Sequence, residues 1–179
     1  EEGMDDICDV MRVCTDRCFS MSRFITCFAD VVKIPDPTVS RANLNDLVFT
    51  CKRFMEGMCN DRRIKLRMEI DETLKDVMLD SSLFEQVLVN IIKNAAESIE
   101  TDGEIIIRPL SPATIEVTDN GKGISKETEA KLFSPFFSTK PNGQGIGLIF
   151  IREVLMRHGC TFSLRTYADG LTKFRIIFP

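Results

Sequence analysis

The chain has 179 residues, of which 44% are hydrophobic and 28% are charged, and its formal net charge is -4. These values are typical of a globular domain long enough to bury a core, and the acidic balance argues against nucleic acid or an anionic membrane surface as a partner. No hydrophobic run approaches the roughly 20 residues of a membrane-spanning helix, so we expect no membrane span in this sequence.

The cysteine pattern predicts a reducing, cytoplasmic environment. The seven cysteines are an odd number, include no CxxC pair and follow no secretory signal. Cys14 and Cys18 lie one helical turn apart, but no second pair of metal ligands accompanies them, so we interpret the cysteines as small hydrophobic residues. Because the sequence begins on Glu1 within helix-forming sequence, we expect a fragment whose remaining part could carry a sensor or a membrane anchor.

The first predicted element is a long helix that packs against other helices. Hydrophobic residues recur at steps of three and four, the spacing of a coiled-coil or helical-bundle seam. These seam residues are Ile7, Met11, Cys14, Cys18, Met21, Ile25, Phe28 and Val32. Pro35 and Pro37 end the predicted helix, so we assign 1–38 to this helix with its linker and 39–179 to a separate domain.

The remaining elements predict an α/β (α+β) two-layer sandwich, with a mixed sheet covered by helices on one face. Asn43 is expected to cap the first helix of this domain, and Ser82 with Glu85 to form a capping box that opens the second. Pro109 and Pro112 are expected to interrupt a hairpin. In chain order we expect a helix from 44 that closes within 57–61, strands over 64–70 and 77–79, a helix over 82–99, strands over 104–108 and 114–119, a helix over 146–158, and strands over 161–167 and 172–178.

The helix over 82–99 carries a polar stripe beside its hydrophobic one. Its members are Gln86, Asn90, Lys93, Asn94 and Glu97. Most stripes of this kind are solvated faces, yet asparagine is a poor helix former, and here two asparagines lie one turn apart. Amide oxygens on one face can bind Mg²⁺ and leave its other positions to phosphate oxygens. The stripe alone leaves both interpretations open.

Asp119 ends the predicted strand over 114–119 and shares one face with Ile115 and Val117, so its carboxylate lies in line with core residues. A buried carboxylate needs a hydrogen-bond donor. The exocyclic amine of adenine is one candidate, because the glycines at 121 and 123 allow close approach of a flat ligand. An aspartate that only caps its own turn is the other interpretation.

A second glycine pattern, Gly143, Gly145 and Gly147, precedes the helix over 146–158. Glycines at this place let backbone N–H groups and the helix N-terminus bind phosphate. The pattern is neither a P-loop nor a Rossmann fingerprint, because no Gly-Lys-Ser/Thr follows it and no strand leads into it.

The order of these motifs resembles the GHKL superfamily of ATP-binding domains, which includes gyrase, certain chaperones, mismatch-repair ATPases and histidine kinases. The series is N-x-x-x-N on a helix, D-x-G-x-G after a strand, L-F-S-P-F-F-S-T-K, and G-x-G-x-G before a helix. It covers about Asn43 to Pro179 and includes the ending Gly170-x-Thr172-x-Phe174-Arg175-Ile176.

The resemblance implies ATP and Mg²⁺ as cofactors and assigns residues to them. Asn94 is implied as the Mg²⁺ ligand, Asn90 and Lys93 as its neighbours at the phosphates, Asp119 as the adenine acceptor, and Phe136 and Phe137 as lid residues. The full set implied to bind the nucleotide is Asn90, Lys93, Asn94, Asp119, Gly121, Gly123, Ile124, Phe136, Phe137, Lys140, Gly143, Gln144, Gly145, Ile146, Gly147, Leu148 and Thr172.

Within this superfamily the chain is most similar to nitrogen-regulation-type sensor histidine kinases. The hydrolases have a glutamate where Asn90 stands, and an amide cannot take a proton from water. The resemblance implies that 1–38 is the second helix of an incomplete dimerisation hairpin with its linker and that 39–179 is the ATP-binding catalytic domain. This domain is implied to phosphorylate a histidine on the missing first helix, with a homodimer and a response regulator receiver domain as partners. His158 is the one histidine of the chain, and we interpret it as structural. A nucleotide-gated interaction module without phosphotransfer, or an ATPase of the same superfamily, remains an alternative.

Overall fold

Helices and strands alternate along the part of the chain that the computed structural model describes, which is residues 10–19, 21–22, 25, 34–134, 137 and 147–179. Residues 10–19 are helical and exposed, including Met11, Cys14 and Cys18 of the predicted seam. No helix within the described residues is long and hydrophobic enough to cross a membrane. The other elements are β1 (Ser40–Ala42), α2 (Leu44–Asp61), β2 (Lys65–Met68), β3 (Val77–Leu79), α3 (Ser81–Ile99), β4 (Glu104–Leu110), β5 (Thr114–Asp119), α4 (Lys126–Glu129), α5 (Gly147–Arg157), β6 (Thr161–Thr166) and β7 (Thr172–Ile177).

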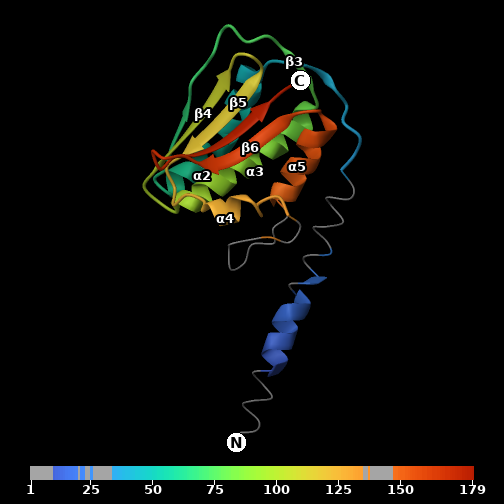
Figure 1. The fold of residues 1–179 in the computed structure, drawn as a ribbon, viewed down its shortest axis with the longest axis vertical. Coiled ribbons are helices and arrows are strands. Elements are labelled where there is room, and N and C mark those ends of the chain that lie inside the picture. The colour runs from blue at the N-terminus through green and yellow to red at the C-terminus, as the bar shows by residue number, and fades with distance from the viewer. Residues whose placement is uncertain (1–9, 20, 23–24, 26–33, 135–136, 138–146) are drawn as a thin grey trace, which may run out of the picture.

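A mixed five-stranded sheet organises the domain. Its strand order is β2-β4-β5-β7-β6, and only β2 and β4 run parallel among the described strands of this sheet. β1 and β3 form a separate antiparallel pair. The helices α2, α3 and α5 lie on one face of the large sheet (Figure 1). This arrangement confirms the predicted fold class.

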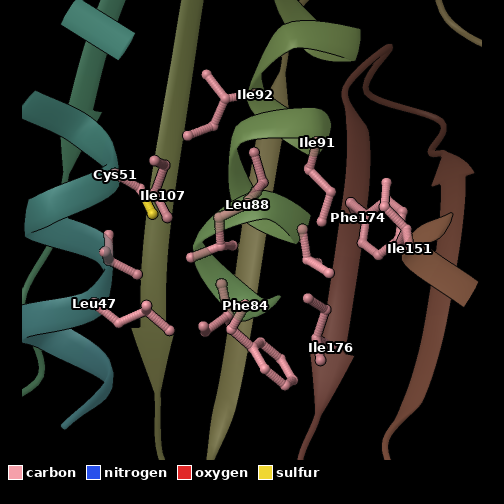
Figure 2. Packing of buried hydrophobic residues seen from close by; sticks show 14 of the residues in the cluster. Leu47, Cys51, Phe84, Leu88, Ile91, Ile92, Ile107, Ile151, Phe174 and Ile176 are labelled. Carbon is pink, nitrogen blue, oxygen red and sulfur yellow. The ribbon is translucent and has the colours of Figure 1, made fainter. Parts of the chain in front are cut away.

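The hydrophobic core lies between the sheet and these helices, with α3 packed between α2 and α5 (Figure 2). From α3, Phe84, Leu88 and Ile92 are fully buried and face strand residues such as Ile107 and Ile176. Full burial of a leucine or isoleucine side chain stabilises a fold by about 1.5–3 kcal/mol. The core therefore holds α3, which carries the polar stripe, firmly against the sheet.

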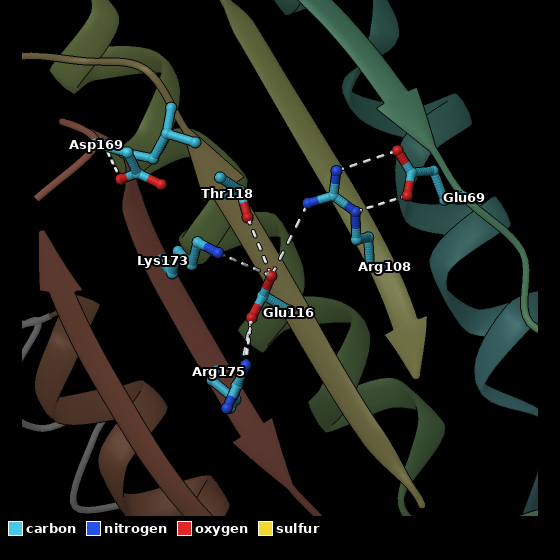
Figure 3. A network of polar contacts seen from close by, with 8 residues as sticks. Glu69, Arg108, Glu116, Thr118, Asp169, Lys173 and Arg175 are labelled. Atoms are coloured by element: carbon cyan, nitrogen blue, oxygen red, sulfur yellow. Dashed lines mark hydrogen bonds and ion pairs between the residues drawn. The ribbon is translucent and has the colours of Figure 1, made fainter. Parts of the chain in front are cut away.

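The opposite face of the sheet is polar at its centre, although every residue of β5 is buried. The Glu116 carboxylate accepts a hydrogen bond from Arg175 at 2.8 Å, and it lies 3.7 Å from Lys173 and 3.9 Å from Arg108 (Figure 3). Arg108 also pairs with Glu69 at 2.6 Å. Burial of an unpaired carboxylate is costly, so the three cations explain how Glu116 is accommodated.

The start of α3 differs from the prediction. The capping box predicted at Ser82 and Glu85 is wrong, because α3 begins one residue before Ser82 and Asp80 is its N-cap. Asp80 has extended backbone dihedrals, and its Oδ1 accepts a hydrogen bond from the Leu83 amide at 3.1 Å. Aspartate caps helices as well as serine does, and two suitable caps stand close together in this sequence.

Other differences concern short or proline-containing segments. β4 continues through Pro109, where the sequence predicted an interruption. β2 ends at Met68 opposite Ile107, so beyond that point one side of β4 has no strand neighbour and a missing N–H costs little. The strand β1 and the short helix α4 were not predicted.

The linker before β1 docks onto the domain. Ile34 is buried in the core, and the Arg157 guanidinium at the end of α5 donates a hydrogen bond to the Ile34 carbonyl at 2.8 Å. The Thr38 amide donates to Asp80 Oδ2 at 2.8 Å. Asp80 therefore caps α3 with one oxygen and holds the linker with the other.

Candidate functional site

The candidate site centres on Asp119, the last residue of β5. Its side chain is only 6% exposed, and the Gly121 amide donates a hydrogen bond to Oδ1 at 2.9 Å. Burial raises the pKa of the Asp119 carboxyl to about 6, and the hydrogen bond from Gly121 opposes this rise. Among the described residues no other group donates to the carboxylate. The interpretation of Asp119 as a cap of its own turn is therefore confirmed at one oxygen, and its interpretation as an adenine acceptor stays a prediction.

The loop after Asp119 lies against the C-terminal end of α3. A Cβ on Gly121 would lie 2.5 Å from the Ser98 hydroxyl and 2.8 Å from the Ser98 backbone carbon, so only glycine fits there. The Lys122 amide donates to the Ser98 carbonyl at 3.3 Å. Gly123 has a φ of +76°, a conformation that glycine adopts readily. These contacts fix the loop beside α3.

Three polar residues form a row across neighbouring strands. Asp119 pairs with Thr172 across β5 and β7, and Thr172 pairs with Thr166 across β7 and β6. Thr172 is buried, and its hydroxyl oxygen lies 3.0 Å from that of Thr166. Residues directly opposite in antiparallel strands have Cβ atoms about 4.5–5.5 Å apart, so a carboxylate and two hydroxyls meet on the helix-covered side.

The polar stripe of α3 leads directly to this row. Asn90 and Asn94 are half-buried and Lys93 is exposed. Asn94 lies one turn from Ser98, which contacts Gly121, and Asn90 lies one further turn away. With a rise of about 1.5 Å per residue, each of these steps covers about 6 Å along the helix. The structure thus brings the asparagines and Asp119 to one side of the domain.

The start of the L-F-S-P-F-F-S-T-K motif packs in an aromatic cluster on the sheet. Phe133 packs edge-to-face against Phe162 of β6 and Phe174 of β7, with ring centroids 5.0 Å and 6.4 Å apart. Arg152 of α5 donates a hydrogen bond to the Phe133 carbonyl at 3.2 Å. Phe133, which precedes the predicted lid residues Phe136 and Phe137, is therefore fixed to the sheet and to α5.

Several predicted site residues lie outside the described residues. They are Phe136, Lys140, Gly143, Gln144, Gly145 and Ile146. Phe137 and Leu148 are half-buried, and Gly147 is the first residue of α5. A Cβ on Gly147 would meet no described atom within 4 Å, so packing against these residues does not explain the glycine.

His158 has the structural role predicted for it. Its Nε2 accepts a hydrogen bond from the Asp80 amide at 3.1 Å, so Nδ1 carries the proton and donates to the Val154 carbonyl at 2.7 Å. The ring also packs edge-on against Phe84. Both nitrogens are occupied and the side chain is buried, so His158 is not available as a nucleophile.

Comparison with known proteins identifies the domain. Residues 79–179 match the family described as histidine kinase-, DNA gyrase B-, and HSP90-like ATPase. The chain belongs to this ATPase family. The sensor histidine kinase ZraS of Salmonella typhi is 30% identical over an alignment of 178 residues, and the match covers 97% of this chain and 38% of that protein. The sensory histidine kinase/phosphatase NtrB of Rhizobium meliloti (strain 1021) is 35% identical over an alignment of 137 residues, and the match covers 66% of this chain and 36% of that protein.

A solved structure agrees with these relatives. The catalytic domain of histidine kinase ThkA is 29% identical to this chain, with a TM-score of 0.70, and the match covers 79% of this chain and 95% of that one. The chain spans less than 40% of the length of ZraS and of NtrB. The matched part is an ATP-binding catalytic domain of the kind that sensor histidine kinases carry.

Within this ATPase-family domain, the sequence missed residues that act through contacts rather than motifs. Ser98 and Thr166 hold the two ends of the loop after Asp119, since Ser98 packs on Gly121 and Thr166 accepts the Ile124 amide at 2.7 Å. Neither residue belongs to a recognisable spacing. Phe133 stood within the L-F-S-P-F-F-S-T-K motif, and its place beside two lid phenylalanines was the available signal.

Proposed function

We propose that this ATPase-family domain binds Mg·ATP and transfers the γ-phosphate to a histidine outside this sequence, for relay to an aspartate of a response regulator. The observation that carries the proposal is the buried Asp119 carboxylate, which has one oxygen bonded to Gly121 and lies opposite Thr172. A buried carboxylate costs free energy unless hydrogen-bond donors or positive charges pair with it. The adenine amine is the donor that fits.

The adenine end of the site would be held by residues already close together. Asp119 accepts from the exocyclic amine, Thr172 contacts the base edge, and the loop over 120–124 covers one face of the ring. The close packing of Gly121 on Ser98 gives this loop a fixed position. A preformed site loses little conformational entropy when the base binds.

The phosphate end would lie along the α3 stripe. Asn94 would hold Mg²⁺ through its amide oxygen, with Asn90 and Lys93 beside the phosphates. Among the described residues no group of three or more His, Cys, Asp or Glu could hold a metal ion. A single amide oxygen from Asn94 fits Mg²⁺, which is usually held by one or two protein oxygens together with substrate phosphates and water. The bound ion would neutralise charge on the phosphates.

The proposed phosphate acceptor follows from the absence of a general base at position 90. Asn90 cannot act as a general base, which argues against hydrolysis and against transfer to serine. A neutral imidazole is nucleophilic without a base. The single histidine of the sequence is buried with both nitrogens hydrogen-bonded, so the acceptor belongs to another segment or molecule.

The exposed helix over residues 10–19 supports a homodimer as the setting for this transfer. Met11 is 64% exposed, and Met21 and Ile25, further along the same seam, are 63% and 62% exposed. An exposed seam of this spacing is typical of helices that pack against other helices.

Free, buried Cys51 and Cys160 support a cytoplasmic location.

Calorimetry with Mg·ATP tests the binding site. The Asp119→Asn variant loses a charge-assisted hydrogen bond to the base, and we expect its affinity to fall more than about tenfold, which corresponds to roughly 1.5–3 kcal/mol. Asp61→Asn, at the exposed end of α2, is the control and should bind as the wild type does. Equal affinities of Asp119→Asn and wild type would refute the adenine assignment.

Labelling with γ-phosphate-labelled ATP tests the transfer. We expect no acid-labile label on this chain alone and clear label on an added dimerisation hairpin that carries a histidine. Binding without any label would favour the nucleotide-gated module, and steady release of inorganic phosphate would favour an ATPase.

A further inference from the structure

Thr166 connects two parts of the candidate site that no motif links. It is the last residue of β6, and its hydroxyl oxygen accepts the Ile124 amide at 2.7 Å while it lies 3.0 Å from the Thr172 hydroxyl. A Cβ on Gly123 would lie 3.1 Å from the Thr166 methyl group, so the loop also packs on this side chain. The end of the loop and the hydroxyl of Thr172 thus meet at one side chain.

The direction of these hydrogen bonds follows from counting protons. A threonine hydroxyl has one hydrogen and two acceptor positions, and the Ile124 amide takes one acceptor position of Thr166. If Thr166 donates to Thr172, the free hydrogen is that of Thr172. If Thr172 donates instead, the free hydrogen is that of Thr166, one strand further from Asp119. The Asp119 carboxylate lies opposite Thr172 without a hydrogen bond to it, and its negative charge favours the first arrangement, which leaves the free hydrogen on the nearer hydroxyl.

We infer that Thr166 is a positioning residue of the nucleotide site: it orients the Thr172 hydroxyl as a donor beside the Asp119 acceptor and fixes the loop at Ile124. An acceptor next to a donor matches adenine, which has an amine at C6, whereas guanine places an acceptor oxygen at that position. Thr166 therefore contributes to the preference for adenine without contact with the base. This inference rests on the proposed binding of adenine at Asp119.

The test uses the full chain and measures ATP and GTP affinities by calorimetry. Thr166→Val keeps the shape of the side chain and removes the hydroxyl, and we expect ATP affinity to fall about fivefold to tenfold, the usual effect of one lost hydrogen bond, while GTP affinity changes little. Thr166→Ser keeps the hydroxyl and should restore the wild-type ratio. If the valine variant does not fold, as judged by circular dichroism, the comparison of Thr166→Ser with Thr166→Ala gives the same information.

A double-mutant cycle separates positioning from a general structural role. In a Thr172→Val background, Thr166→Val should cause a smaller further loss of ATP affinity, because the hydroxyl that it orients is gone and only its bond to the Ile124 amide remains to be lost. Additive losses, an unchanged ATP to GTP ratio, or a serine variant as weak as the valine variant would each overturn the inference. Asp119→Asn is measured in parallel. Normal ATP binding by Asp119→Asn would refute the proposed site itself. If Asp119→Asn fails to bind ATP but Thr166→Val binds it with wild-type affinity, only the role of Thr166 is refuted.

Discussion

At the scale of a single residue, the burial of Asp119 opposes the charge that the proposed adenine contact would use. Its folded-state pKa of about 6 lies above its ordinary value of 3.8, because burial penalises the charged form. Folding therefore favours the protonated carboxyl. The contribution of this group to stability is fully present below about pH 4 and is lost as the pH rises through about 6. At neutral pH the buried carboxylate is charged at a cost in stability, and the proposed contact with the adenine amine would offset that cost.

The raised pKa of Asp119 leads to a prediction for the stability of Asp119→Asn in the absence of nucleotide. The asparagine amide is uncharged at every pH, and its oxygen can still accept a hydrogen bond from Gly121. We therefore expect the variant to be more stable than the wild type at pH 8. The difference should reach up to about 3 kcal/mol, since a pKa shift of one unit corresponds to about 1.4 kcal/mol. Near pH 4 the two proteins should unfold alike. Thermal melting from pH 4 to 8 gives the comparison, and a variant less stable than the wild type at pH 8 would contradict this account of the carboxylate.

At the scale of an element, α3 depends on one capping side chain. Asp80 caps its first turn and accepts the Thr38 amide. Removal of a helix N-cap costs about 0.5–2 kcal/mol, and we expect Asp80→Ala to lose at least that much because the linker contact is lost as well. Urea denaturation should show a lower midpoint with an unchanged slope.

Ser82→Ala provides the matched control for this measurement. Ser82 was the predicted cap, but its side chain is exposed, and exposed substitutions usually change stability by less than about 0.5 kcal/mol. Equal losses for the two variants would mean that Ser82 shares the capping role.

Some features of these elements could be predicted from the sequence and others could not. Asn43 was predicted as a cap, and its side chain accepts from the amides of the two residues that follow Leu44. The alternation of β5 predicted the burial of Asp119 and the choice of face. Thr166 could not be found in this way, because its role depends on the register of β6 with β7, which no local pattern encodes. β1 has three residues, too few for a period to be visible.

At the scale of the whole molecule, the linker is part of the packed domain. Ile34 lies in the core, whereas the sequence placed the boundary between 38 and 39, and we propose that the folded unit begins near Ile34. A fragment over 34–179 should be more stable than one over 39–179 by about 2–3 kcal/mol, from the burial of one isoleucine and the linker hydrogen bonds. Urea denaturation of both fragments tests this.

A point substitution checks the same conclusion without truncation. Ile34→Ala should reduce the stability of the chain, and Val39→Ala, at a side chain that is 46% exposed, should leave it nearly unchanged. If the shorter fragment and Ile34→Ala were both as stable as the chain over 34–179, the contact of Ile34 with the core would contribute nothing.

The position of α3 between two attachment points has a mechanical consequence. The helix has 19 residues and is about 28 Å long, so it connects two distant parts of the domain rigidly. At its N-terminus Asp80 accepts a hydrogen bond from the linker, and near its C-terminus Ser98 packs against the turn at Gly121. If the docked linker stabilises that turn, a nucleotide bound at the proposed site must stabilise linker docking by the same free energy, because linkage between two sites is reciprocal. The linker contact and the proposed adenine site would then be coupled through α3.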